Sequence, residues 1–413
     1  MRRQPPSTRS LRPKSRLSTC DQDKQKVGRR LPDEPIAPSS SRPLPEARKT
    51  KSLFLKQETL MIQTAPIFVA TLVLLLNALS TRAEADPVAS KEAPSAVPVI
   101  STDVPVKLDN KPKAPAKPAD PQLVPTHANV PYGTHERQVL DFWQAKSERP
   151  APLLFFIHGG GWVAGDKNSV GPKIQTMLDA GISVVSINYR YSWQAQLAGV
   201  KPPVKAPLED AARALQFVRS KAVEWNIDKS RIGASGGSAG ACSSLWLAFH
   251  KDMADPNNSD PIARESTSLW CAAVDGAQTS LDPKQLREWT PNSRYGGHAF
   301  GFMDPNDIKT RDTRFAEFLE HREEVLPWIV EYSPIEHVTT YDPAIYLNYT
   351  SSPAIGQDQK DPTHTANYGV KLQEKCKEAG VPCELVYPGA PDVKHATSTA
   401  FLIDALNGFP KPQ

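Results

Sequence analysis

The feature that most constrains the fold is an alternation of short apolar runs and amphipathic segments over residues 130–410. A continuous apolar run such as 152–157 is typical of a strand buried on both faces. Residues 207–225 instead carry their apolar side chains at helical spacing. Because strand-like and helix-like segments alternate along the chain, we predict an α/β protein with a doubly wound, mostly parallel sheet and helices on both faces.

The predicted strands and helices can be placed individually. Strands are expected at 152–157, 182–189, 231–234, 269–274, 344–348 and 384–387, and helices at 170–180, 207–225, 239–250, 313–324, 370–379 and 397–406. Residues 276–340 break this alternation, because they are polar and rich in Arg, Glu, Pro and Trp. We expect them to form an insertion that covers or flanks the carboxyl edge of the sheet, where α/β proteins bind ligands.

The first 60 residues differ from the rest in charge. They carry 15 Lys and Arg against 6 Asp and Glu, whereas the remainder carries 34 against 39. Because a nucleic-acid-binding domain carries its basic patch itself, the mildly acidic remainder argues against a nucleic-acid partner. Residues 1–60 are expected to be disordered or to precede the true start, and a nucleic-acid or membrane arm is the alternative.

Residues 61–85 have the pattern of a secretory signal peptide. The dense apolar stretch 65–79 is short for a membrane span, and Ala83-Glu84-Ala85 matches a cleavage site. We therefore predict export to a periplasmic or extracellular location, without stable membrane insertion after cleavage; an uncleaved anchor is the alternative. Residues 86–125 hold nine prolines and predict an extended linker. This leaves 126–413 as one folded domain.

The cysteines indicate a modest structural role. Export permits disulfides, and Cys376 and Cys383 flank a predicted helix-to-strand turn where a bridge is geometrically possible. Cys242 and Cys271 fit buried positions better. No His or Cys spacing suggests a metal site, so we predict neither a metal nor an organic cofactor.

A Gly-x-Ser-x-Gly pattern, Gly236–Gly240, stands where a predicted strand meets a predicted helix. In that setting the central Ser238 occupies a sharp turn that exposes its hydroxyl beside a helix N-terminus. We therefore predict Ser238 as a nucleophile. The run His158-Gly-Gly-Gly161 follows the 152–157 strand, and its glycines can aim N–H groups at one point. Acyl transfer needs such donors for its oxyanion, and we expect them from Gly160, Gly161 and Ala239, with His158 structural.

The base and the acid must come from other loops. His395 lies after the last predicted strand, in a position from which its imidazole could reach Ser238, and is the expected base. The acid should lie between the two along the chain. Asp361, in the loop after the 344–348 strand, is the first choice, and Asp358 and Asp275 are alternatives.

Taken together, these motifs resemble those of the α/β-hydrolase superfamily, specifically the hormone-sensitive-lipase-like and feruloyl-esterase-like exported bacterial esterases. The resemblance covers about residues 128–408 and includes the oxyanion loop 158–167, Asn188-Tyr-Arg190, the turn around Ser238 and Asp361-Pro362. It departs from the family in an extra stretch, 351–360, ahead of Asp361, and in Gly237 where the family has an acidic residue. The resemblance implies an α/β-hydrolase fold and hydrolysis of carboxylic esters.

The resulting hypothesis is a serine esterase that acts on a small-molecule or polysaccharide-linked ester. An amidase or peptidase would use the same three groups, and the motifs do not separate these activities. A binding protein of the same fold is a third possibility, which the intact nucleophile and base disfavour. The sequence leaves the acyl length, the alcohol and the oligomeric state open.

Overall fold

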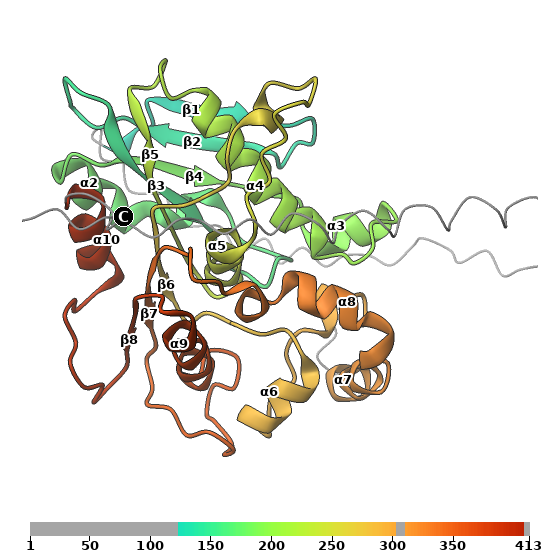
Figure 1. Ribbon diagram of the computed structural model, residues 1–413. Helices are drawn as coiled ribbons and strands as arrows, with labels where there is room; N and C mark the ends of the chain where they lie inside the picture. The colour runs from blue at the N-terminus through green and yellow to red at the C-terminus, as the bar shows by residue number, and fades with distance from the viewer. Residues whose placement is uncertain (1–122, 303–309, 409–413) are drawn as a thin grey trace, which may run out of the picture. The chain divides into compact units, whose positions relative to one another are not determined.

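The structure is a computed structural model that describes residues 123–302 and 310–408 (Figure 1). The predicted basic segment 1–60, the signal peptide 61–85 and the linker 86–125, apart from its last three residues, lie outside the described residues. No helix in the described part of the chain is both long enough and apolar enough to cross a membrane.

One eight-stranded sheet organises the domain. Its spatial order is β1-β2-β4-β3-β5-β6-β7-β8, with β2 antiparallel to both of its neighbours and all later pairs parallel. This confirms the predicted mostly parallel sheet. The strands are β1 His127–Pro131, β2 Val139–Trp143, β3 Ala151–Ile157, β4 Ser183–Ile187, β5 Ile227–Gly237, β6 Cys271–Asp275, β7 Ala344–Asn348 and β8 Cys383–Val386.

Helices cover both faces of this sheet, so each central strand supplies side chains to two cores. In β3, Leu153 and Phe155 belong to the larger core, whereas Leu154 and Phe156 belong to the smaller one. The alternation follows from the two-residue repeat of a strand and explains why the run is apolar throughout. The larger core contains residues of α4 Lys205–Ser220, α5 Ala239–Phe249 and α9 Asn367–Ala379, and the smaller one residues of α2 Gly171–Asp179 and α10 Ser398–Asn407.

The long predicted helix at 207–225 is shorter in the structure, because α4 ends at Ser220. The chain then turns, and Trp225 packs its ring on Phe142 of β2 with 4.5 Å between ring centroids. The apolar stripe therefore continues into a turn that buries Trp225 against the sheet, which helical spacing alone does not reveal.

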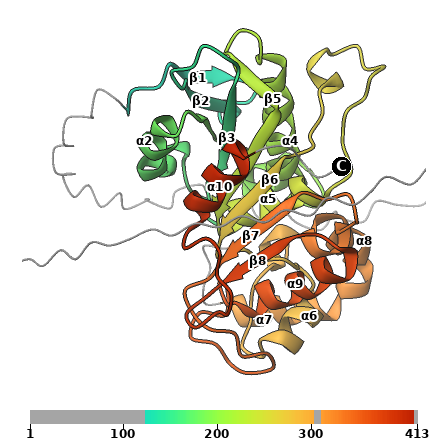
Figure 2. The same ribbon diagram turned by 60° about the vertical axis from the view of Figure 1, so that its left-hand side comes forward.

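The insertion at 276–340 folds as a helical layer. It contains α6 Pro283–Trp289, α7 Arg311–Glu320 and α8 Arg322–Tyr332, which gather beside α9 at the β8 end of the sheet in both views (Figures 1 and 2). Buried Asp282 accepts two hydrogen bonds from Arg322, at 2.7 and 2.6 Å, and so ties α6 to α8. A short helix, α3 Ser192–Leu197, completes the set, and the four cysteines of the described residues are free thiols.

Candidate active site

Ser238 stands alone between the last residue of β5 and the first residue of α5, with φ 54° and ψ −124°. This left-handed conformation is costly for a residue with a side chain, and such strain persists where the surroundings enforce it. The Ser238 N–H donates to the carbonyl of Asp275 at 3.0 Å. A Cβ at Gly240 would lie 2.1 Å from the Ile157 carbonyl oxygen, so only glycine permits this tight turn.

One loop brings a histidine to Ser238 and a carboxylate to that histidine. The Nε2 atom of His364 lies 2.9 Å from Ser238 Oγ, and its Nδ1 atom lies 2.8 Å from Oδ2 of Asp361. The three groups thus form a chain from hydroxyl through imidazole to carboxylate. Such an arrangement can take a proton from the hydroxyl and stabilise the imidazolium that results.

Asp361 is held in this place by its own turn. Its Oδ1 atom accepts the backbone N–H groups of Thr363 at 3.1 Å and His364 at 3.2 Å, while Oδ2 faces the imidazole. Partial burial by itself raises the pKa of Asp361, but these bonds and the imidazole outweigh burial and lower that pKa. Asp361 is therefore ionised at neutral pH and can orient the histidine.

The structure corrects the expected position of the base, because it does not bring His395 to Ser238. The His395 N–H donates to Oε1 of Glu384 at 2.6 Å, and its Nδ1 lies 2.7 Å from Oε2 of the same carboxylate. Its Nε2 lies 3.1 Å from Asp404 Oδ2. Both ring nitrogens therefore face carboxylates of β8 and α10, and the ring is engaged away from the serine.

The expected acids fall into different places. Asp361 is in contact with an imidazole, although with that of His364 and not His395. Asp358 has an exposed side chain in the same loop. Asp275 has its carboxylate in contact with Lys173, Asn348 and Ser398, and so is occupied by other partners.

The glycine loop after β3 lies against the nucleophile turn. A Cβ at Gly159 would lie 2.6 Å from the Gly237 carbonyl oxygen and 3.4 Å from Ser238 Cβ. Gly160 and Gly161 both have positive φ values, 105° and 61°. Ala239 begins α5, and the first N–H groups of a helix have no partner within it. The loop therefore meets Ser238 at Gly159, and Ala239 follows Ser238 directly in the chain.

His158 supports this loop from within the core, as expected. Its ring is fully buried and stacks on Tyr189 with 4.2 Å between centroids, and Nδ1 lies 2.7 Å from the Gly159 carbonyl oxygen. Burial lowers the pKa of His158 to about 4, so the ring is neutral. The Tyr189 hydroxyl donates to the His158 carbonyl at 2.9 Å.

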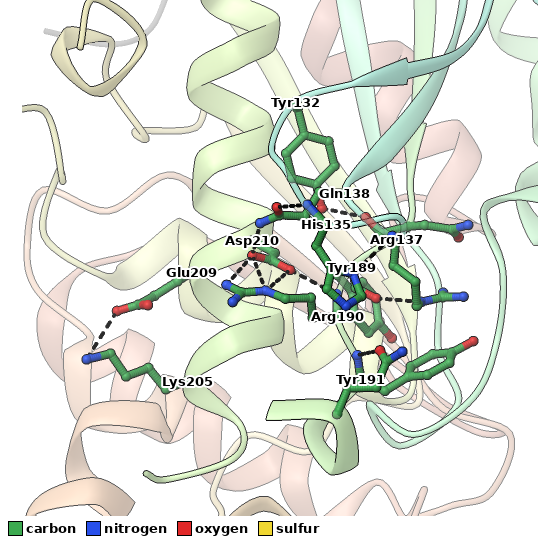
Figure 3. Close-up of polar contacts among 12 residues, drawn as sticks. Tyr132, His135, Arg137, Gln138, Tyr189, Arg190, Tyr191, Lys205, Glu209 and Asp210 are labelled. Atoms are coloured by element: carbon green, nitrogen blue, oxygen red, sulfur yellow. Dashed lines mark hydrogen bonds and ion pairs between the residues drawn. The ribbon is translucent and has the colours of Figure 1, made fainter. Parts of the chain in front are cut away.

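A polar network fixes the segment that contains Tyr189 (Figure 3). Asp210 of α4 accepts bonds from Arg190 at 2.7 Å and from Gln138 at 2.7 Å, and its side chain is almost fully buried. Arg137 donates from Nε to the Tyr189 carbonyl at 2.8 Å. These bonds fix the backbone at Tyr189 and Arg190. They thereby hold the Tyr189 ring on which His158, the first residue of the glycine loop, is stacked.

The insertion contributes His298 next to the glycine loop. A Cβ at Gly161 would lie 3.7 Å from His298 Nε2, and the buried His298 ring packs 5.9 Å from that of Trp162. Burial lowers the pKa of His298 to about 4. The prediction that residues 276–340 flank the carboxyl edge of the sheet is thereby confirmed for the part of the insertion that the structure describes.

A cavity of about 300 Å³ opens beside His364. The side chains that line it include two carboxylates and one amide; the residues are Asp275, Gly276, Asn348, Thr350, Asp361 and His364. Within the described ranges there is no cluster of three or more His, Cys, Asp or Glu residues that could hold a metal ion.

Sequence reasoning missed His364. The signal that could have found it is the spacing Asp361-Pro-Thr-His364, which places a carboxylate and an imidazole in one turn. The sequence favours His395 instead, because the base usually follows the last strand in the chain order of such enzymes.

Comparison with known proteins gives three findings. The profile of a family described as BD-FAE matches residues 140–375. Esterase LipQ of Mycobacterium tuberculosis (strain ATCC 25618 / H37Rv) is 32% identical over 286 residues, which cover 66% of this chain and 58% of LipQ. Carboxylesterase NlhH of the same strain is 29% identical over 139 residues, which cover 33% of this chain and 41% of NlhH. The chain thus spans less than two thirds of the length of these relatives.

A solved structure described as a bifunctional GH43-CE of Bacteroides eggerthii has a TM-score of 0.50 and 17% identity, covering 68% of this chain and 37% of that one. At this level of identity the likeness bears on the fold alone.

Proposed function

Because the chain belongs to the BD-FAE family, we propose that it is a serine hydrolase of carboxylic esters. The observation that carries this proposal is the chain of contacts from Ser238 Oγ to His364 Nε2 at 2.9 Å and from His364 Nδ1 to Asp361 at 2.8 Å. Ser238 is the nucleophile, His364 the general base and Asp361 the acid. His364 thus takes the role that the sequence suggested for His395.

The reaction proceeds in two acyl transfers. His364 accepts the Ser238 proton while Oγ attacks the ester carbonyl, and a tetrahedral oxyanion forms. As this intermediate collapses, the bond from the carbonyl carbon to the alcohol oxygen breaks, and His364 gives its proton to the leaving alcohol. Water then attacks the acyl-serine by the same route and releases the carboxylic acid.

The oxyanion is stabilised by backbone N–H groups of Gly160, Gly161 and Ala239. The contact of Gly159 with Gly237 supports this assignment, since it holds the loop beside the nucleophile. In the part of the chain that the structure describes, the N–H groups of Gly160 and Gly161 donate to no backbone carbonyl, so they remain available to a substrate.

We propose that the alcohol part of the substrate binds in the cavity beside His364. Thr350 and Asn348 offer hydrogen-bonding groups there, and the cavity of about 300 Å³ is at the small end of ligand pockets. An alcohol that carries several hydroxyl groups matches this lining better than an alkyl alcohol. This supports a polysaccharide-linked ester as substrate. We also propose that residues 61–85 direct the protein out of the cytoplasm, where such a substrate would be met.

The test is hydrolysis of p-nitrophenyl acetate, butyrate and decanoate by the purified full-length chain. We expect turnover that disappears in Ser238→Ala and persists in Ser351→Ala, an exposed control. A fluorophosphonate should add its phosphonyl group to the Ser238 peptide, detected by mass spectrometry. Turnover that survives in Ser238→Ala would exclude this nucleophile, and cleavage of p-nitroacetanilide in preference to the esters would identify an amidase.

The proposed location has a separate test. Expression of the full-length chain in a bacterial host with an intact secretion pathway should yield a periplasmic or extracellular protein whose N-terminus is Asp86. A cell-associated protein that retains residues 61–85 would contradict cleavage.

A further inference from the structure

Asp275, the last residue of β6, accepts side-chain hydrogen bonds from three other elements of the fold. Its Oδ1 accepts from Asn348 Nδ2 at 2.9 Å, and its Oδ2 accepts from Ser398 Oγ at 3.1 Å and Lys173 Nζ at 3.3 Å. These partners come from β7, α10 and α2, so one carboxylate joins three elements to β6.

Stability alone does not account for this cluster. The side chain of Asp275 is 39% exposed and that of Lys173 is 22% exposed. An ion pair this accessible to water contributes at most about 1 kcal/mol to folding. The three hydrogen bonds instead fix the position of the Asp275 carboxylate, and with it the backbone on either side of Asp275.

The backbone of Asp275 holds the nucleophile. Its carbonyl accepts the Ser238 N–H at 3.0 Å, and Ser238 is the residue with the strained φ of 54°. Because strained backbone relaxes unless the surroundings hold it, this bond has a direct influence on the direction of Oγ.

The next residue holds the base. Gly276 has φ 61°, and its N–H donates to the Asn348 carbonyl at 2.8 Å. A Cβ built there would lie 3.4 Å from both Cβ and Cδ2 of His364 and 3.6 Å from Cγ. The imidazole therefore packs on the bare backbone of Gly276, and the same two-residue segment meets both Ser238 and His364.

We propose that Asp275 and Gly276 position the nucleophile and the base relative to each other, and that Lys173, Asn348 and Ser398 hold the Asp275 carboxylate for this purpose. This inference rests on the proposed serine hydrolase. Asp275 is a positioning residue and not a catalytic one, since its carboxylate bonds to Lys173, Asn348 and Ser398 and not to the two reacting side chains. A displacement of about 1 Å between reacting groups costs up to about 100-fold in rate, so small shifts of this segment are measurable.

Gly276→Ala tests the contact with the base. The added methyl group meets the His364 ring and strains the positive φ, whereas Gly356→Ala strains a φ of 76° with no atom within 4 Å of the new Cβ. The two variants thus share the backbone strain and differ in the contact. With p-nitrophenyl acetate we expect kcat to fall about 10- to 100-fold in Gly276→Ala and less than about twofold in Gly356→Ala, with KM unchanged in both.

The carboxylate is tested by a graded pair. Asp275→Asn keeps the shape and the bond from Asn348 but turns an N–H group toward Lys173 and Ser398, and Asp275→Ala removes all three contacts. We expect kcat to fall about threefold to tenfold in the first and further in the second, with KM unchanged. Glu265→Gln is the control, because it breaks the Lys229–Glu265 pair at 3.2 Å.

The outcomes separate the two proposals. If Ser238→Ala keeps its activity, the serine hydrolase itself is wrong. If Ser238→Ala is inactive but Gly276→Ala and Gly356→Ala have equal kcat, the serine hydrolase stands and the positioning role is wrong. Thermal unfolding serves as a check on folding: a loss of melting temperature without a selective loss of kcat in the Asp275 variants would make the cluster merely structural.

Discussion

The loops after β7 and β8 each present a histidine to a carboxylate, yet only one of the two histidines reaches Ser238, the proposed nucleophile. In the first loop, His364 has Asp361 on Nδ1 and Ser238 on Nε2. In the second, His395 has Glu384 on Nδ1 and Asp404 on Nε2. The partner of Nδ1 is a carboxylate in both loops, so the two histidines differ in the partner of Nε2. We infer that this second partner decides what each histidine does. A hydroxyl there makes a proton acceptor of the ring, and a second carboxylate makes it a link between β8 and α10.

The burial of the two rings supports this reading. The side chain of His395 is 11% exposed, whereas that of His364 is 37% exposed. A base must meet a substrate and exchange protons with it, which the more open ring allows. A ring held between two carboxylates and shielded from water serves to join elements.

The largest expected effect is on the two rings themselves. His364→Ala should lower kcat for p-nitrophenyl esters by about 10⁴-fold or more, because the nucleophile loses its base. His395→Ala should change kcat by less than about threefold, since its partners lie away from Ser238. Steady-state kinetics on both variants decides between them, and a collapse of kcat in His395→Ala alone would restore the expectation drawn from the sequence.

The carboxylates sharpen the same contrast. Asp361→Asn should lower kcat by about 10³- to 10⁴-fold, because the amide can no longer stabilise the imidazolium and favours the wrong tautomer. Asp358→Asn, an exposed neighbour in the same loop, should leave kcat within about twofold. Equal losses in the two variants would show that the loop, and not the carboxylate of Asp361, is what matters.

A third prediction concerns His158, a buried histidine without a carboxylate partner: it should make the free energy of unfolding depend on pH. Burial lowers the pKa of His158 to about 4, against 6.5 in the unfolded chain. Between these values the unfolded chain binds a proton that the folded one does not, so the stability that the neutral ring contributes is complete above pH 6.5 and is lost as pH falls toward 4. This difference corresponds to on the order of 3 kcal/mol.

Chemical denaturation at a series of pH values measures this loss. His158→Asn should flatten the fall in unfolding free energy between pH 6.5 and 4. His321 is the matched control, because its bond with Glu324 raises its pKa and so stabilises the fold at low pH. His321→Asn should therefore leave the acid slope unchanged or make it steeper; a flatter slope in this variant would contradict the assignment.

Much of this architecture could be predicted because local sequence determines it. The strand at 344–348 has the predicted bounds, and the turn around Ser238 follows from glycines whose Cβ atoms would collide with the backbone of β3. The base is harder to predict than the turn, because two histidines follow Ser238 in suitable loops. The choice depends on the bond of His395 to Glu384 and on the approach of His364 to Ser238, which lies 126 residues earlier in the chain. Only the folded chain brings the second pair together.

The smallest expected effect is the cost of breaking the His395 link. His395→Gln removes the ring nitrogen that faces Glu384 and cannot span the distance to Asp404, so we expect a loss of about 1–2 kcal/mol in unfolding free energy. Urea denaturation measures this loss, and Glu384→Gln should cost a similar amount because it weakens the same contact. In the double variant the two losses should be less than additive, since each substitution alone already breaks the bond. Full additivity would mean that His395 and Glu384 stabilise the fold separately, and the second histidine–carboxylate pair would then be no unit at all.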